Sequence, residues 1–179
     1  MEKQQKGRVI ITSARNIMAL EIARSLGSKG IEIIAADCIS FTMLAYSKYV
    51  SHHEEYTNYE ENEQQFLDDL EKIVKKHKPD DGRPFLLIPV FRETMIISKN
   101  AERFLPHIKV AVPPFRAIEK VHPKDNLFKT ASRQEVNIPE TYLPEKESDL
   151  EEITANHPFP LITKPYAGTG GTGIHKVRF

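Results

Sequence analysis

The fold class of this chain is decided by residues 8–36, RVIITSARNIMALEIARSLGSKGIEIIAA. Within them, Arg8–Thr12 is a short β-branched run, which is typical of a strand buried on both faces. Apolar residues spaced three and four apart follow and predict a helix, for which Ser13 is the expected N-cap. Glycines end this helix before the apolar run Ile31–Ala36. Strand, helix and strand in this order predict a βαβ unit with parallel strands.

Strand-like and helix-like segments continue to alternate up to the Pro113-Pro114 pair, which ends the first domain near residue 115. The expected segments are a strand at Lys48–His53, an amphipathic helix at Asn62–His77, a strand at Phe85–Pro89, a helix at Phe91–Phe104 and a strand at Ile108–Val112. Residues 1–115 are therefore predicted to form a doubly wound, mostly parallel α/β domain of the Rossmann-like kind.

Residues 116–179 differ in composition and are expected to begin a second, α+β domain. The expected segments are helices at Arg116–Val121, Asp125–Val136 and Glu147–Asn156, and strands at Pro158–Lys164 and Ile174–Phe179. The two strands flank a glycine-rich loop and are expected to form a hairpin-like flap. Because the final apolar strand has no turn or partner after it, we expect the chain to be truncated and this domain to be incomplete at its C-terminus.

The loop between these two strands carries the clearest chemical pattern of the chain, KPYAGTGGTGI at residues 164–174. Four of the eight glycines fall within residues 168–173, and glycine lets successive backbone N–H groups approach phosphate oxygens. Two threonine hydroxyls and a lysine ammonium at the strand end add further donors. The predicted nucleotide-binding residues are Lys164, Gly168, Thr169, Gly170, Gly171, Thr172 and Gly173. A P-loop fits poorly, because in a P-loop the lysine comes after the glycines and a helix follows. Here the lysine precedes the glycines, and a strand follows them. A surface hairpin with a flexible tip is the simpler alternative.

Charge and composition exclude several classes of function. The 25 basic and 25 acidic residues balance, so no overall field attracts nucleic acid or an anionic membrane. Cys38 is the single cysteine, which excludes an internal disulfide and leaves the histidines without a zinc-site spacing. The N-terminus is polar, and no apolar run is long enough to span a membrane. We therefore expect a cytoplasmic protein whose partners are small molecules, and we leave a homodimer open.

Charged residues lie at the expected carboxyl edge of the first sheet, where open α/β sheets bind ligands. Asp37 ends the second strand, where a dinucleotide-binding domain would hold a ribose. The first turn, Thr12–Ile17, contains no glycine, which argues against a dinucleotide, so Asp37 is expected to cap a helix or to face a substrate. Arg15, Arg92 and Glu93 lie at strand-to-helix junctions and are candidates for recognising a small carboxylate, although surface ion pairing explains them equally well.

The strand ending in Lys164-Pro165, the glycine-rich loop and the following strand resemble the ATP-grasp superfamily, particularly its carbamoyl-phosphate-synthase-like members. In that family a helix leads into a Gly-Ile-Pro-x-Pro-x-Thr connection, and here Asp125–Gln134 leads into Asn137–Thr141, NIPET. The resemblance covers nearly the whole chain. The first domain is similar to the family's pre-ATP-grasp domain at Ser13–Arg15, Leu20–Arg24, Ala36-Asp37 and Ile88–Glu93.

This resemblance implies an ATP-dependent ligase. Such enzymes use ATP to phosphorylate a carboxylate, and an amine or another nucleophile then attacks the acylphosphate, while Mg²⁺ bridges the ATP phosphates. By this resemblance, Lys164 contacts an ATP phosphate and the adenine, and Gly168–Gly173 cover the phosphates. The implied cofactors are ATP and Mg²⁺, and the implied partners are small carboxylate and amine-type substrates.

Two features depart from the family pattern. The upstream helix of the family begins with an Asp-Lys pair whose lysine reaches ATP, whereas the aligned residues here are Asp125-Asn126. Lys124 and Lys129 are the candidates to replace that lysine. The family's magnesium ligands lie downstream of the loop, so we assign no metal ligand and no catalytic residue, and we expect the chain alone to be inactive. The alternative is a non-catalytic α/β module that binds a ligand or partner and carries a vestigial loop.

Overall fold

The structure is a computed structural model that describes residues 6–168 and 170–178. It divides into two compact units, Met1–Phe115 and Arg116–Phe179, each of which is described by itself. Among the described residues, no helix is both long and apolar enough to cross a membrane.

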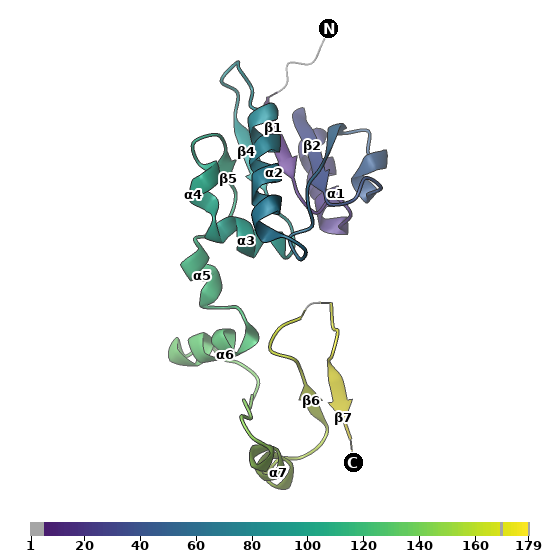
Figure 1. The fold of residues 1–179 in the computed structure, drawn as a ribbon. Coiled ribbons are helices and arrows are strands. Elements are labelled where there is room, and N and C mark those ends of the chain that lie inside the picture. The colour runs from purple at the N-terminus through teal and green to yellow at the C-terminus, as the bar shows by residue number, and fades with distance from the viewer. Residues whose placement is uncertain (1–5, 169, 179) are drawn as a thin grey trace. The chain divides into compact units, whose positions relative to one another are not determined.

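The first unit contains a five-stranded parallel sheet with the strand order β3-β2-β1-β4-β5 (Figure 1). Its strands are β1 (Gly7–Ile11), β2 (Ile31–Asp37), β3 (Val50–Glu55), β4 (Phe85–Ile88) and β5 (Lys109–Val110). The central strand β1 pairs with both neighbours, so that Val9 lies opposite Ile33 on one side and Leu86 on the other. The predicted parallel α/β domain is confirmed.

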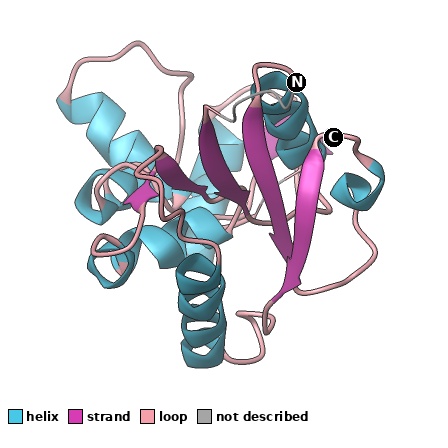
Figure 2. Cartoon of the chain, turned by 90° about the horizontal axis from the view of Figure 1, so that it is seen from above, coloured by secondary structure: helices cyan, strands magenta, loops and turns pink. Residues whose placement is uncertain are grey.

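Helices cover both faces of this sheet (Figure 2). The helices on one face are α2 (Glu63–Lys76), α3 (Glu93–Lys99) and α4 (Ala101–Phe104), and those on the other are α1 (Ile17–Gly27) and the short 3-10 helix η1 (Met43–Tyr46). Successive strand residues point to opposite faces, so each apolar strand supplies both layers. Ile10 of β1 packs toward α2, whereas its neighbours Val9 and Ile11 pack toward α1.

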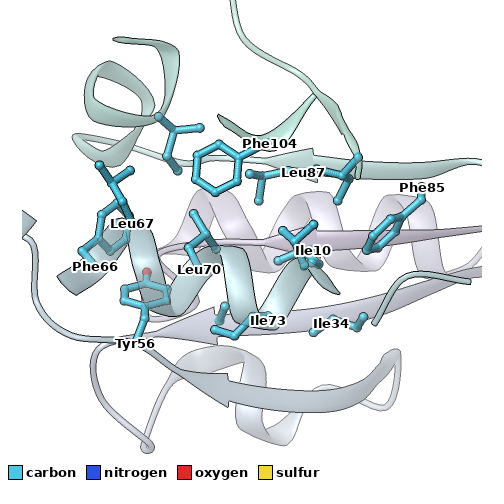
Figure 3. Close-up of a cluster of buried hydrophobic side chains, with 14 residues drawn as sticks. Ile10, Ile34, Tyr56, Phe66, Leu67, Leu70, Ile73, Phe85, Leu87 and Phe104 are labelled. Atoms are coloured by element: carbon cyan, nitrogen blue, oxygen red, sulfur yellow. The ribbon is translucent and has the colours of Figure 1, made fainter. Parts of the chain in front are cut away.

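The larger apolar core lies between the sheet and α2 (Figure 3). Leu70 and Ile73 of this amphipathic helix pack over Ile10, Ile34 and the neighbouring strands. Each fully buried side chain of this size contributes about 1.5–3 kcal/mol relative to an exposed one. The Asn62 side chain caps the helix by accepting a hydrogen bond from the Gln65 N–H at 3.0 Å.

Three local predictions are corrected by the structure. Ser13 is not the N-cap of α1; it has a positive φ of 51° and precedes the cap Asn16, whose side chain accepts from the Met18 N–H. The single helix expected over Phe91–Phe104 is two helices that meet at Asn100, whose backbone lies outside the helical region. The last strand is shorter than expected and spans only Lys109–Val110.

The second unit contains helices and one antiparallel strand pair. Its elements are α5 (Phe115–Glu119), α6 (Lys124–Arg133), α7 (Glu147–Asn156), β6 (Leu161–Thr163) and β7 (His175–Val177). Leu161 of β6 lies opposite Val177 of β7, and Thr163 lies opposite His175, so the expected hairpin-like pair is present. Within the described part of residues 116–178, Ala131 is the one buried hydrophobic side chain.

Candidate functional site

The glycine-rich loop connects the ends of β6 and β7. Its glycines at 168, 170, 171 and 173 all have positive φ values, of 133°, 65°, 80° and 73°, a region that other residues rarely adopt. The Ile174 N–H donates to the Gly171 carbonyl at 3.2 Å, which closes the turn before β7. The sequence clusters its glycines here because the backbone turns through conformations that side chains disfavour.

Packing also favours glycine at position 173. A Cβ atom at this position would lie 3.1 Å from Cγ of Pro165, which is tighter than an ordinary van der Waals contact. Gly170 and Gly171 differ, because a Cβ at either position would meet nothing within 4 Å. The tip of the loop therefore faces open space and leaves its backbone accessible to a ligand.

The predicted side-chain donors of the loop are exposed where the structure describes them. Lys164 follows β6 directly and makes no hydrogen bond or ion pair to another described residue that would occupy its ammonium. Thr172 is exposed within the loop. Thr169 lies outside the described residues. An uncommitted lysine beside accessible glycine backbone can bind an anionic group, and phosphate suits both kinds of donor.

The two lysines that could replace the missing family lysine have different surroundings. The Lys124 ammonium donates to the carbonyl oxygens of Pro165 and Gly168 at 3.0 and 3.1 Å. Lys129 instead pairs with Asp125 one helical turn away, at 3.1 Å. Among the loop residues that the structure describes, Lys124 contacts Gly168 and the preceding Pro165, whereas Lys129 contacts none of them.

The described residues fit a phosphate better than a magnesium ion. Mg²⁺ prefers oxygen ligands from carboxylates, and residues 6–168 and 170–178 contain no group of three His, Cys, Asp or Glu side chains that could hold a metal. We therefore assign none of the described residues to Mg²⁺. The loop glycines and Lys164 offer N–H and ammonium donors, which are the kinds of group that bind phosphate.

A second polar cluster lies at the carboxyl edge of the parallel sheet in the first unit. Asp37, which is 1% exposed, ends β2 and accepts from the Arg15 N–H at 2.8 Å. The Arg15 guanidinium also pairs with this carboxylate at 2.6 Å and contacts the Cys38 sulfur at 2.6 Å. Asp37 therefore does not cap a helix by its side chain; it holds the turn after β1 and orients Arg15, whose side chain is 48% exposed.

Glu93 lies at the same edge of the sheet, but its side chain is buried rather than exposed. The carboxyl group is 2% exposed, and its Oε1 accepts a hydrogen bond from the Tyr56 hydroxyl at 2.6 Å. The hydroxyl oxygen in turn accepts from the Ser13 N–H at 3.1 Å. Burial raises the pKa of Glu93, although the neighbouring Thr12 and Tyr56 hydroxyls act in the opposite direction. Burial and the Glu93 charge both raise the pKa of Tyr56, so its hydroxyl keeps its proton.

Arg92 is separated from this buried pair. Its guanidinium is half exposed and contacts Glu60 at 3.3 Å, so it makes the surface ion pair that the sequence left open as an alternative. Arg15, Arg92 and Glu93 thus lie near the same sheet edge but do not converge as one set: each has a different partner, at Asp37, Glu60 and Tyr56.

A small cavity of about 60 Å³ lies beside Asp37, between the ends of β2 and β3. Thr42 lines it, and the Thr42 hydroxyl is buried without a hydrogen-bond partner among the described residues. The volume suits a few water molecules rather than a nucleotide or an organic substrate. The cavity is therefore not the main candidate site.

Sequence reasoning missed Tyr56, and it named Lys124 as a candidate without predicting the contact of Lys124 with the glycine-rich loop. Tyr56 follows β3 and connects the turns after β1 and β4, but a single tyrosine at a strand end has no distinctive sequence pattern. The contact between Lys124 and the loop joins residues 41 and 44 positions apart, and local sequence patterns do not report contacts at that separation.

Comparisons with known proteins identify the fold. No protein-family model and no curated protein matches the chain. Among solved structures, the L-amino acid ligase from Bacillus licheniformis has a TM-score of 0.67 and 17% identity over 98% of this chain and 39% of that one. The biotin carboxylase domain of the Hydrogenobacter thermophilus 2-oxoglutarate carboxylase, a dimer in complex with MgADP, ADP and bicarbonate, has a TM-score of 0.59 and 18% identity over 95% and 37%.

A third similar structure is the N5-carboxyaminoimidazole ribonucleotide synthetase from Thermotoga maritima, with a TM-score of 0.56 and 17% identity over 98% of this chain and 41% of that one. The chain thus spans about two fifths of the length of each of these proteins. At this level of identity the likeness concerns the fold. All three are ATP-grasp proteins, and this chain has the fold of the N-terminal region of that family.

Proposed function

We propose that this chain is the N-terminal part of an ATP-dependent ligase and that its glycine-rich loop binds the phosphates of ATP. The observation that carries the proposal is the loop itself: exposed glycines with positive φ, between antiparallel strands, directly after Lys164. The shared fold supports it, because one of the similar structures holds MgADP. In this role Lys164 supplies positive charge, and the accessible N–H groups of the loop donate to phosphate oxygens.

The reaction that we propose for the whole protein is activation of a carboxylate as an acylphosphate, followed by attack of an amine or a similar nucleophile. Two of the similar structures are a ligase and a synthetase by name, and the third contains bicarbonate. ATP supplies the phosphoryl group, and Mg²⁺ would be held by residues other than those described here. In this reaction, the proposed role of the residues of this chain is to bind and orient the phosphates of ATP.

We further propose that the carboxylate substrate is recognised at the sheet edge by Arg15. Its guanidinium is exposed and held in place by Asp37, and a guanidinium can bind a carboxylate through two parallel hydrogen bonds. Arg92 is a second, less constrained cation at this edge. Glu93 is buried, so we assign it to holding the turn that carries Arg15 rather than to contacting the substrate.

The test of the phosphate site is a titration of ATP into the ¹⁵N-labelled 179-residue chain, followed by the amide resonances of the loop glycines. We expect these resonances to shift with saturation, and tripolyphosphate to compete because it carries the same phosphate groups. The Lys164→Ala variant should bind ATP about tenfold more weakly, the usual order for one lost charge-assisted contact. Lys176→Ala removes an equal charge from the exposed strand β7 and serves as the matched control.

Two results would refute the proposed function. One is an ATP titration that leaves the loop glycines of the unaltered chain unshifted at millimolar nucleotide. The other is an equal loss of affinity in Lys164→Ala and Lys176→Ala, which would indicate a general charge effect rather than a site. Ligase activity of the whole protein would be measured separately, as carboxylate-dependent release of ADP.

A further inference from the structure

Lys124 connects the first residue of α6 to the beginning of the glycine-rich loop. Its backbone N–H donates to the Tyr166 carbonyl at 3.1 Å. Its ammonium donates to the carbonyl oxygens of Pro165 and Gly168, at 3.0 and 3.1 Å. One residue thus binds three carbonyl groups of a segment that is some forty positions away in the sequence, and it does so within the second unit.

The neighbouring polar residues of α6 have other partners. Asn126 donates its side-chain amide to the Glu119 and His122 carbonyls, at 2.9 and 3.3 Å, and so holds the turn that precedes the helix. Lys129 pairs with Asp125 on its own helix. Within this helix, therefore, the contact with the loop is made by Lys124, two positions before the residue that aligns with the family's ATP-contacting lysine.

The direction of these contacts determines which way the loop backbone points. In a trans peptide the C=O and the following N–H point in opposite directions. When the carbonyls of Pro165 and Tyr166 face Lys124, the N–H groups of Tyr166 and Ala167 face away from it. A cation that binds the carbonyls on one side of the segment therefore leaves N–H donors on the other side, where an anion can meet them.

We propose that Lys124 is a positioning residue that holds residues 165–168 by their carbonyl groups, so that the N–H groups of the loop are presented to phosphate. We call the three hydrogen bonds from Lys124 to the Pro165, Tyr166 and Gly168 carbonyls the clasp. The inference rests on the proposed ATP-binding function, because it assigns Lys124 to the same site. The ammonium acts through the loop backbone, and its charge beside the loop also favours an anionic ligand.

The experiment compares the unaltered chain with Lys124→Met, Lys124→Arg and Lys129→Met. Methionine preserves much of the apolar length of the side chain and removes the donors, whereas arginine retains charged donors. Lys129→Met removes one charge from the same helix without touching the loop contacts, so it is the matched control. Thermal unfolding by circular dichroism first establishes that all three variants are folded.

The first measurement is independent of nucleotide: the rate at which chymotrypsin cleaves after Tyr166, with the fragments identified by mass spectrometry. Tyr166 is exposed and its own carbonyl belongs to the clasp, and proteases cut segments that open locally. We expect cleavage to be about tenfold faster in Lys124→Met, restored toward the original rate in Lys124→Arg, and unchanged in Lys129→Met.

The second measurement is the ATP titration of the same proteins. We expect the dissociation constant to rise about tenfold in Lys124→Met and to recover in Lys124→Arg. Unchanged cleavage in Lys124→Met would overturn the clasp. Faster cleavage together with unchanged ATP affinity would overturn its role toward phosphate. Failure of the unaltered chain to bind ATP would refute the proposed function itself, whereas faster cleavage in Lys124→Met would still support an ordering contact.

Discussion

Replacing Tyr56 by phenylalanine isolates the hydroxyl that connects two turns at the sheet edge. The hydroxyl donates to Glu93 at 2.6 Å and accepts from the Ser13 N–H at 3.1 Å, and both partners are buried. The aromatic ring should remain in place, because it packs edge-on against Phe66 with ring centroids 5.0 Å apart. The substitution therefore removes hydrogen bonds without creating a large cavity.

The expected cost is about 3 kcal/mol in the free energy of unfolding. Two hydrogen bonds are lost, and a buried N–H and a buried carboxyl oxygen lose their partners, each of which costs about 1–3 kcal/mol. The lower half of that range is appropriate, because local relaxation can bring water to the edge. Tyr59→Phe is the matched control: Tyr59 also packs on Phe66, but its hydroxyl is exposed and interacts with the surface residues Glu60, at 3.4 Å, and Arg92.

The assay is urea unfolding followed by far-UV circular dichroism, since the chain contains no tryptophan. Equal slopes against urea would indicate that the variants expose equal surface on unfolding. We expect a clear loss for Tyr56→Phe and a loss below about 0.5 kcal/mol for Tyr59→Phe. If the two variants lost equal stability, or if Tyr56→Phe lost less than about 1 kcal/mol, the reasoning about the buried pair would be wrong.

Three further outcomes follow from the first unit. Gly27→Ala should cost about 2 kcal/mol, measured by the same unfolding assay, because the new Cβ would lie 2.5 Å from Cβ of Tyr49. Asp69 is partly buried, which acts to raise its pKa, but hydrogen bonds led by Thr57 outweigh this and lower the pKa to about 2. Its stabilising contribution is therefore present above pH 3.8 and lost as the pH falls toward about 2, and Asp69→Asn should flatten the stability profile there. The opposite sign holds for Glu93, whose pKa is raised above 4.5: stability should fall as pH rises from that value, and a Glu93→Gln titration that keeps this fall would contradict the assignment.

The sheet and its main helices could be predicted because they depend on local apolar patterns. β1 and β2 are β-branched runs that pack on both faces, and α2 has one apolar face, so burial alone fixes their type. The predicted N-cap of α1, Ser13, was wrong, because Ser13 and Asn16 are both good N-cap residues by type and the N-cap is Asn16. Tertiary hydrogen bonds account for the turn that separates them, because the Ser13 N–H donates to Tyr56 and the Arg15 N–H donates to Asp37.

The candidate sites could be predicted only in part, for the same physical reason. The glycine-rich loop is visible in the sequence because its chemistry lies in consecutive residues. The burial of Glu93 is not visible, because glutamate is usually exposed and only the surrounding turns place it inside. The Lys124 contact depends on how α6 meets the β6–β7 pair, which no local pattern records.

The turns after β1 and β4 explain why the phosphate site is expected elsewhere. β1 lies between β2 and β4, so the chain changes direction across the sheet at these two strands, which is where ligands bind in this architecture. Both turns contain a non-glycine residue with positive φ, Ser13 at 51° and Phe91 at 64°, a conformation that costs about 1–2 kcal/mol. A dinucleotide site would place glycine in the first turn and bring its backbone against a pyrophosphate. Here the first turn instead carries Arg15, whose exposed guanidinium pairs with the buried Asp37. An exposed guanidinium suits a compact anion such as the carboxylate of a substrate. The glycines that let a backbone approach a polyphosphate occur together in the second unit. We therefore propose the carboxylate site for the first unit and the phosphate site for the second.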